Sequence, residues 1–436
     1  MTTASPAPPT APDDLATAPV PHLVTDVPGP RAREAVARDE AVTSPSLGRV
    51  YPLVVARAAG CVVEDVDGNR FLDANAGIAV NSTGHCHPRV VAAIRDQAER
   101  LLHYCATDFY VPVYAELCAR LAAGAPVGGP ARVFLGNSGT EVVEAAIKLA
   151  RRATGRFGVI AFHGAFHGRT YGSLSLTASK PGYRAGFGPF LPGVHHVPYG
   201  VPGAIDDLVF GRLSPPDDIA AVVVEPILGE GGYIVPPAGW LAELRRICDD
   251  HGIVLVADEI QSGMGRSGRL WAVEHEGIHP DVLLSAKGLA SGMPVAALIA
   301  RSERMTWATG SHGSTFGGNP VACAAALATL DLVEGGLVAN AAVVGAHLLA
   351  RLAVLQLHRP DAIREVRGRG LMIGLELRTH DDVLALEAAA FRRGLLLLGC
   401  GDSTVRIAPP LVVSREQADV LVDVLADALD DAVPRR

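Results

Sequence analysis

Between about residues 130 and 300, short apolar runs alternate with stretches of helical periodicity, and few folds accommodate such an alternation. Strands that are separated by helices join into mostly parallel sheets with helices on both faces. The sequence therefore predicts an α/β fold with a large three-layer domain. The expected strands are 132–135, 158–162, 220–224, 253–257, 282–286 and 295–300, with helices such as 141–153 and 240–251 between them.

The regions on either side of this alternation have other patterns. Residues 1–20 are rich in Pro, Ala and Thr, as in a disordered tail. Residues 48–75 alternate like a small β-meander, and 87–102 have helical periodicity. A helix at 341–355, strands at 371–377, 396–398 and 405–407, and a closing helix from Ser414 predict a compact α+β domain. We therefore divide the chain into a tail (1–20), an N-terminal segment that packs with the small domain (21–75), a large domain (76–335) and a small C-terminal domain (336–436).

Charge and cysteine content argue against several classes of protein. The net charge of −8 is dispersed and no basic stripe carries interleaved aromatics, so we expect no nucleic-acid partner. No run reaches the roughly 18 uninterrupted apolar residues of a membrane span. The seven cysteines form no C-x-x-C pair and no zinc-like spacing, so we expect no metal site and reduced thiols. The first Arg or Lys is Arg31, so the chain's start lacks the pattern of a secretory signal, and we expect a cytoplasmic protein.

Lys287 is the first candidate for chemistry. The chain has 38 lysine and arginine residues, and only three of them are lysines. Unlike Arg, a desolvated Lys loses its proton and can attack a carbonyl. Lys287 follows the run 282–286, so it is expected at the C-terminal end of a strand, where ligands bind in open α/β sheets. A surface lysine that caps the strand is the alternative that position alone leaves open.

A glycine-containing turn follows the first strand of the series. The segment Gly136-Asn137-Ser138-Gly139-Thr140-Glu141 leads from a strand into a helix. The free N–H groups at the start of that helix, together with the helix dipole, form an anion-binding site. Ser138 and Glu141 also have the spacing of a capping box, so plain helix capping is the alternative interpretation.

Acidic residues follow two neighbouring strands of the predicted sheet. Glu225 and Glu230 come after the run 220–224, and Asp258 comes after the run 253–257. A carboxylate shielded by apolar residues stays ionised only beside a cationic partner, and a protonated heterocyclic nitrogen is one such partner. Ordinary ion pairs would explain any one of these acids. Several acids, a lysine and an anion-binding turn at one edge of one sheet favour a ligand site.

Two further segments carry possible binding motifs. The segment Phe166-His167-Gly168-Arg169-Thr170 brings together a ring that can stack and a guanidinium that can bind a carboxylate, although a polar loop is the alternative. Residues 263–268 match the G-x-G-x-x-G pattern of dinucleotide sites. Such a motif begins directly after a strand and starts a helix, whereas residues 258–262 intervene here, so we do not favour a dinucleotide site.

Taken together, these segments resemble the class III (ornithine/4-aminobutyrate type) aminotransferases, enzymes that depend on pyridoxal 5′-phosphate. The resemblance covers about residues 50–430 and implies the fold-type I architecture of such transferases. It rests on Gly84-His85-x-His87-Pro88, Asn137-Ser138-Gly139, Phe166-His167-Gly168-Arg169-Thr170, Glu225-Pro226-Ile227-x-Gly229-Glu230-Gly231-Gly232, Asp258-Glu259-Ile260-Gln261-Ser262-Gly263-x-Gly265-Arg266-x-Gly268, Lys287, Thr315-Phe316-Gly317-Gly318-Asn319-Pro320 and Arg406-Ile407-x-Pro409-Pro410-Leu411.

The resemblance also implies cofactor-binding roles. Lys287 would hold the cofactor as a Schiff base and move the proton between substrate and cofactor, while Asp258 would keep the pyridine nitrogen protonated. Gln261 would bind the phenolic oxygen and Phe166 would stack on the ring. The remaining expected contacts come from the amides of Ser138, Gly139 and Thr140 to the phosphate, from His167 and Glu225, and from Thr315 of a second subunit. The last contact implies a homodimer, or a tetramer of two dimers.

Substrate-binding roles follow from the same resemblance. Arg169 would bind a substrate carboxylate. Glu230 would pair with Arg406 for one substrate and release it for the other, so that one pocket accepts both an ω-amino donor and 2-oxoglutarate. Ile78 would form part of the pocket wall. Asp108 is a candidate for holding a distal ammonium, and capping of a local turn is its alternative role.

The sequence departs from the family pattern at three places. Thr140 stands where Ala is usual, and residues 104–109 and 398–403 look more like an archaeal-type branch that includes ornithine ω-aminotransferases and amino-acid racemases. The leading hypothesis is amino transfer from a 4-aminobutyrate- or ornithine-type donor to 2-oxoglutarate. The alternative is an amino-acid racemase or epimerase on the same scaffold. A non-catalytic binding protein is disfavoured, because every expected catalytic side chain is present.

Overall fold

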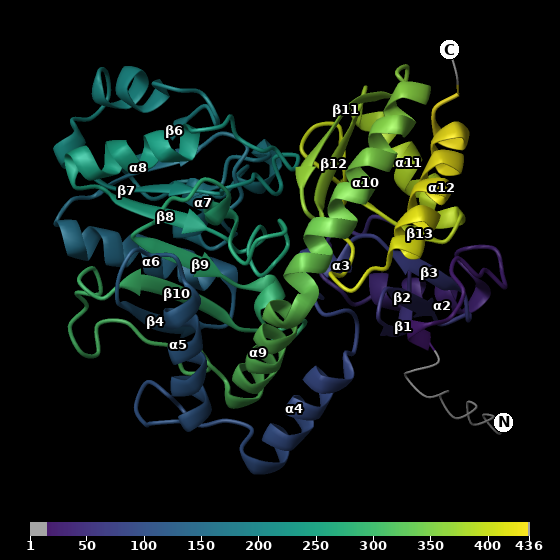
Figure 1. Ribbon diagram of the computed structural model, residues 1–436, viewed down its shortest axis with the longest axis horizontal. Coiled ribbons are helices and arrows are strands. Elements are labelled where there is room, and N and C mark those ends of the chain that lie inside the picture. The colour runs from purple at the N-terminus through teal and green to yellow at the C-terminus, as the bar shows by residue number, and fades with distance from the viewer. Residues whose placement is uncertain (1–14, 435–436) are drawn as a thin grey trace.

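The computed structural model describes residues 15–434, which form a large and a small domain side by side (Figure 1). Residues 1–14 of the expected tail lie outside the described part. The expected tail is wrong for residues 15–20, because Leu15 is buried against Ala59 and Val62. The helices are α2 (Pro30–Glu40), α3 (Ala76–Ala79), α4 (Pro88–Arg100), α5 (Pro112–Gly124), α6 (Gly139–Thr154), α7 (Tyr171–Leu176), α8 (Trp240–His251), α9 (Pro320–Leu332), α10 (Val338–His358), α11 (His380–Arg392) and α12 (Arg415–Ala432).

A seven-stranded sheet lies at the centre of the large domain. Its order is β4 (Ala131–Gly136), β10 (Ala296–Arg301), β9 (Val282–Ser285), β8 (Val254–Asp258), β7 (Ile219–Val224), β5 (Gly158–Phe162) and β6 (Val194–Val197). β10 runs antiparallel to both its neighbours and the remaining pairs are parallel, which confirms the prediction of a mostly parallel sheet. β6 was not predicted, because two of its four residues are histidines; it lies at the edge of the sheet.

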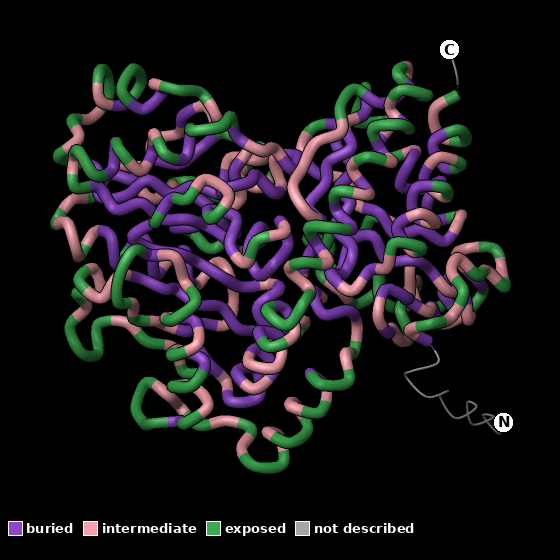
Figure 2. The backbone as a smooth tube through the Cα atoms, viewed as in Figure 1, coloured by how far each residue is buried: buried purple, intermediate pink, exposed green. Residues whose placement is uncertain are grey.

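Alternate residues of the central strands pack against opposite helical layers. Val222 and Leu255 belong to the core shared with α5, α8 and α9. Val223 and Val256 belong to the core shared with α6 and α7. Burial on both faces explains why these strands read as continuous apolar runs. Figure 2 shows the buried strands as a continuous purple layer through the large domain.

The small domain contains two four-stranded sheets. One has the order β11 (Ile363–Arg369), β12 (Met372–Leu377), β15 (Thr404–Ile407) and β14 (Leu398–Cys400), and it shares a core with α10, α11 and α12. The other is the expected N-terminal meander of β1 (Val55–Ala59), β2 (Val62–Asp65) and β3 (Arg70–Asp73), joined by β13 (Leu395–Leu396).

Strand β13 corrects the prediction of a single strand over 396–398. This segment forms two short strands in different sheets: β13 pairs in parallel with β3, whereas β14 pairs with β15 in the C-terminal sheet. Figure 1 shows the purple strands β1–β3 beside yellow β13. Strands from the N-terminal and C-terminal parts of the chain therefore form one sheet. β11 was also missed, because four of its seven residues are charged.

One helical stretch of the described residues, Pro320–His358, is long and apolar enough by length and composition to cross a membrane, with a mean hydropathy of 1.7 in an 18-residue window. It comprises α9, a π-helical turn at Val333–Leu337, and α10, and it runs between the two domains (Figure 1). Leu330 packs in the core of the large domain, and Leu352 packs in that of the small domain. Packing against both cores thus accounts for part of its apolar character.

Candidate active site

A cavity of about 370 Å³ opens at the C-terminal edge of the large sheet. It lies where β4, β5, β7, β8 and β9 end, because the carboxyl ends of parallel strands meet at one edge. The sheet therefore gathers polar residues from five separate loops into one space. The expected site residues that line the cavity are Ser138, Gly139, Thr140, Phe166, His167, Glu225, Glu230, Asp258, Gln261 and Lys287.

Lys287 follows β9 directly and lines this cavity, so it is not a surface residue that caps a strand. Its φ of 43° lies in the left-handed region, which side chains other than glycine rarely adopt. Burial lowers the pKa of Lys287, and the charges of Glu230, Asp258 and Glu225 oppose this shift. A lowered pKa increases the neutral fraction of the amine, which is the form that attacks a carbonyl.

Asp258 and His167 form a buried pair in the lining of the cavity. His167 Nδ1 lies 2.7 Å from Asp258 Oδ2, and the other carboxylate oxygen accepts the N–H of Ile260 at 3.1 Å. Burial acts to lower the pKa of His167, but the hydrogen bond and charge of Asp258 outweigh it and the pKa is raised. His167 holds the Asp258 carboxylate in place, and Asp258 lines the cavity, where a ligand can donate a hydrogen bond to it.

The start of α6 forms another part of the cavity lining. The first N–H groups of a helix have no partner inside it, and Ser138, Gly139 and Thr140 line the cavity there. Glu141 bonds back to the Asn137 N–H and the Ser138 hydroxyl, both at 2.8 Å. The Ser138 hydroxyl donates to this carboxylate and accepts no helix N–H, so the reciprocal capping box does not form.

The donors and acceptors of the cavity fit a small phosphorylated heteroaromatic aldehyde. Gln261 is 7% exposed, and its Oε1 is buried without a hydrogen-bond partner among residues 15–434. Phe166 offers a ring face, Asp258 offers an acceptor for a ring nitrogen, and Lys287 offers an amine. The start of α6 offers N–H groups for a phosphate.

Glu225 joins two loops of the site. Its carboxylate oxygens accept the N–H groups of Phe166 and Gly229, each at 2.7 Å. Burial raises the pKa of Glu225 to about 7. Because both oxygens are engaged by the backbone, Glu225 positions the Phe166 loop and the turn that carries Glu230.

Glu230 and Arg406 form an ion pair at the border of the large and small domains. Arg406 Nη1 and Nη2 donate to the two carboxylate oxygens at 2.5 and 3.1 Å, and Nη2 also donates to the Gly399 carbonyl at 2.9 Å. Burial acts to raise the pKa of Glu230, but the charge and hydrogen bonds of Arg406 outweigh it and the pKa is lowered. The pair is therefore a buried, charged contact directly beside the cavity.

Five expected site residues lie outside the lining of the cavity: Arg406, which pairs with Glu230 beside it, and Arg169, Thr315, Asp108 and Ile78. Arg169 is exposed, with its guanidinium 4.8 Å from the ring centre of Tyr183 and 5.7 Å from that of Phe166. Thr315 and Asp108 are exposed, and the Asp108 N–H donates to the Cys105 carbonyl in a local turn. Ile78 is 37% exposed and has a φ of 66°.

Sequence reasoning missed several features of the site. Val80, Met293 and Pro294 also line the cavity, and none belongs to a motif that would single it out. The sequence gives only a weak signal for the contact between His167 and Asp258: both residues were expected at the same edge of the sheet, but nothing indicated that they touch. The G-x-G-x-x-G segment, by contrast, is a packing element, since Arg266 donates to the Leu371 and Pro409 carbonyls of the small domain.

Comparisons with known proteins show which family this chain resembles over nearly its whole length. The family model described as aminotransferase class-III matches residues 44–429. The acetylornithine aminotransferase of Methanopyrus kandleri is 45% identical over 87% of this chain and 95% of its own, and the 4-aminobutyrate aminotransferase of Mycobacterium bovis is 40% identical over 94% and 98%. A pyridoxal-phosphate-bound amine transaminase from an uncultivated Pseudomonas species superposes with a TM-score of 0.80, at 33% identity over 87% of this chain and 94% of that one.

Proposed function

Because the chain belongs to the class III aminotransferase family, we propose that it moves an amino group from an ω-amino donor to 2-oxoglutarate. Class III aminotransferases depend on pyridoxal phosphate and act on small-molecule amino donors and keto acids. The proposed donors are of the 4-aminobutyrate or ornithine type, N-acetylornithine included, in agreement with the names of the relatives.

The Glu230–Arg406 pair is the observation that supports transfer between two unlike substrates. While the pair is closed, the charge of Arg406 is neutralised and the pocket suits a donor with one carboxylate. 2-Oxoglutarate brings a second carboxylate, which would replace Glu230 on Arg406. A racemase has no second substrate to accommodate, so this pair favours aminotransfer over the alternative.

Each remaining residue has a defined part in this proposal. Bound pyridoxal phosphate would supply the covalent link to the substrate amine and withdraw electrons from its carbon. Lys287 would hold the cofactor in the resting enzyme and afterwards carry the proton between atoms. Asp258, held by His167, would keep the ring nitrogen protonated, and Gln261 would form a hydrogen bond with the phenolic oxygen. Arg169, at the mouth, would bind the distal carboxylate.

We also propose a homodimer in the cytoplasm. Thr315 is exposed and lies outside the cavity of its own chain. A second copy would place it against the neighbouring phosphate, as the family resemblance implies. Size measurement in solution, together with phosphate-site occupancy in Thr315→Ala, tests this arrangement.

A donor panel tests the proposed reaction. Purified enzyme with pyridoxal phosphate is supplied with 4-aminobutyrate, L-ornithine, N-acetylornithine or an L-α-amino acid, with and without 2-oxoglutarate. Glutamate formed only when 2-oxoglutarate is present supports transfer. Loss of chirality of the amino acid without any acceptor would overturn it in favour of racemisation.

A further inference from the structure

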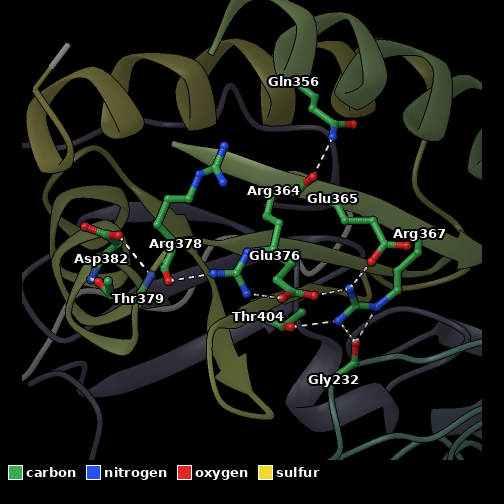
Figure 3. A network of polar contacts seen from close by, with 10 residues as sticks. All are labelled: Gly232, Gln356, Arg364, Glu365, Arg367, Glu376, Arg378, Thr379, Asp382 and Thr404. Carbon is green, nitrogen blue, oxygen red and sulfur yellow. Dashed lines mark hydrogen bonds and ion pairs between the residues drawn. The ribbon is translucent and has the colours of Figure 1, made fainter. Parts of the chain in front are cut away.

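The turn that carries Glu230 is held by the small domain at two backbone positions. The Gly401 N–H donates to the Glu230 carbonyl at 2.7 Å. Arg367 of β11 donates to the Gly232 carbonyl from Nε at 3.1 Å and from Nη2 at 2.8 Å (Figure 3). Both ends of the short segment between Glu230 and Gly232 are therefore attached to the domain that also carries Arg406.

Arg367 and Arg406 lie in one row across the small-domain sheet. Arg367 pairs with Gly374 of β12, and Gly374 pairs with Arg406 of β15. Residues paired directly across antiparallel strands point to the same face of the sheet. A Cβ at Gly374 would lie 3.0 Å from the Gly232 carbonyl oxygen, so this glycine leaves room for the turn. The turn therefore lies over Gly374, between two arginines.

The Arg367 guanidinium is fixed independently of any substrate. It is 12% exposed, Nη2 donates to the Thr404 hydroxyl at 2.9 Å, and Nη1 donates to Glu365 at 2.8 Å and also to Glu376 (Figure 3). Thr404 precedes Arg406 by two residues on β15, so the same strand orients both arginines. Because these contacts already fix the Arg367 side chain, it loses little further conformational entropy when it binds the Gly232 carbonyl of the turn.

We infer that Arg367 is a positioning residue for the Glu230–Arg406 switch. It fixes the backbone of the turn at the place from which the Glu230 carboxylate reaches Arg406, so that only the side chain of Glu230 moves when a dicarboxylate enters. This inference rests on the proposed function. Without Arg367, the Gly401 bond is the remaining backbone contact between the turn and the small domain that we describe, so the closed pair weakens and Arg406 becomes more available to dicarboxylates.

Arg367→Gln tests this role, and Arg364→Gln is its matched control. Arg364 donates to the same Glu376 at 2.9 Å and to the Arg378 carbonyl at 3.2 Å, but it bonds no residue of the turn. Calorimetric titration of the pyridoxal-phosphate-loaded enzyme measures binding of two unreactive ligands, glutarate and pentanoate. Glutarate has a carboxylate at each end, whereas pentanoate has one.

We expect Arg367→Gln to raise the ratio of glutarate to pentanoate affinity about tenfold, the factor that one charge-assisted hydrogen bond contributes to an equilibrium. Arg364→Gln should leave the ratio at the wild-type value. Arg367→Lys keeps one donor without the planar fork, so its ratio should lie between those of wild type and Arg367→Gln.

Glu230→Ala provides the reference for a fully released Arg406. Suppose that the ratio of glutarate to pentanoate affinity rises in Glu230→Ala but is the same in Arg367→Gln as in Arg364→Gln. The positioning role of Arg367 is then overturned, while the Glu230–Arg406 switch stands. If Glu230→Ala also leaves the ratio unchanged, the switch itself fails and the inference fails with it. Should Arg367→Gln not fold, an unchanged ratio in Arg367→Lys overturns the positioning role.

Discussion

Replacement of Glu230 by Ala should convert the pocket into one that prefers dicarboxylates. Both Glu230 oxygens accept hydrogen bonds from Arg406, and the two side chains are only 14% and 5% exposed. A dicarboxylate that uses Arg406 must therefore break this pair before it binds. In Glu230→Ala there is no such competition.

The size of the effect follows from the two contacts that are lost. Hydrogen bonds between charged groups contribute at least about 1.5 kcal/mol each, so two of them contribute about 3 kcal/mol. Every 1.4 kcal/mol corresponds to a factor of about ten in affinity. The Kd of glutarate should therefore fall roughly a hundredfold, whereas that of pentanoate, whose one carboxylate we assign to Arg169, should change much less.

Titration calorimetry of the cofactor-loaded enzyme measures both dissociation constants. Glu387→Gln is the control, because Glu387 is a nearby acid that accepts the Gly399 N–H at 2.6 Å and makes no hydrogen bond to Arg406. Its Kd for glutarate should stay close to the wild-type value. Equal glutarate affinity in wild type and Glu230→Ala would show that a dicarboxylate does not displace Glu230 from Arg406.

Other positions give equally direct tests. Lys287→Arg keeps a cation that cannot bond an aldehyde, so amino transfer and borohydride tagging of peptide 285–288 should both disappear; retained turnover would place the reactive amine elsewhere. Burial raises the pKa of Glu225 to about 7, so the native state still binds a proton at pH values where the unfolded state has released it, above about 4.5. The stability that this proton contributes is therefore complete below about pH 4.5 and is lost as the pH rises to 7. Urea unfolding across this pH range should show that Glu225 accounts for a fall of up to about 3 kcal/mol in the free energy of unfolding, so the total fall should be smaller in Glu225→Gln than in wild type. An equal dependence of the free energy of unfolding on pH in the two proteins would contradict this. A Cβ at Gly345 would overlap the Gly370 backbone, whereas one at Gly335 meets nothing within 4 Å. Gly345→Ala should therefore lower the free energy of unfolding by more than about 2 kcal/mol, and Gly335→Ala should change it little; equal values in a denaturant titration would refute the clash.

The central sheet was predictable because its strands are apolar on both faces. The site was partly predictable for a related reason, since the loops after these strands had to meet at one edge. Strand β11 was not predictable, because four of its seven residues are charged and the local sequence lacks the apolar pattern of a strand. Arg367 makes ion pairs with Glu365 and Glu376, and the ion pair with Glu376 of β12 forms only once the strands of the sheet have paired. The contact of Arg367 with Gly232 depends on the register of three strands and on the docking of two domains. Such a contact has no signal in either segment alone.

The parallel pairing of β3 with β13 also has a consequence for synthesis of the chain. Leu72 and Asp73 leave the ribosome about 320 residues before their partners Leu395 and Leu396. At about 5–20 residues per second, one edge of this sheet waits roughly 16 to 64 seconds for its last strand. During that interval an unpaired strand edge is open to pairing with other nascent chains, a hazard that a chaperone can limit.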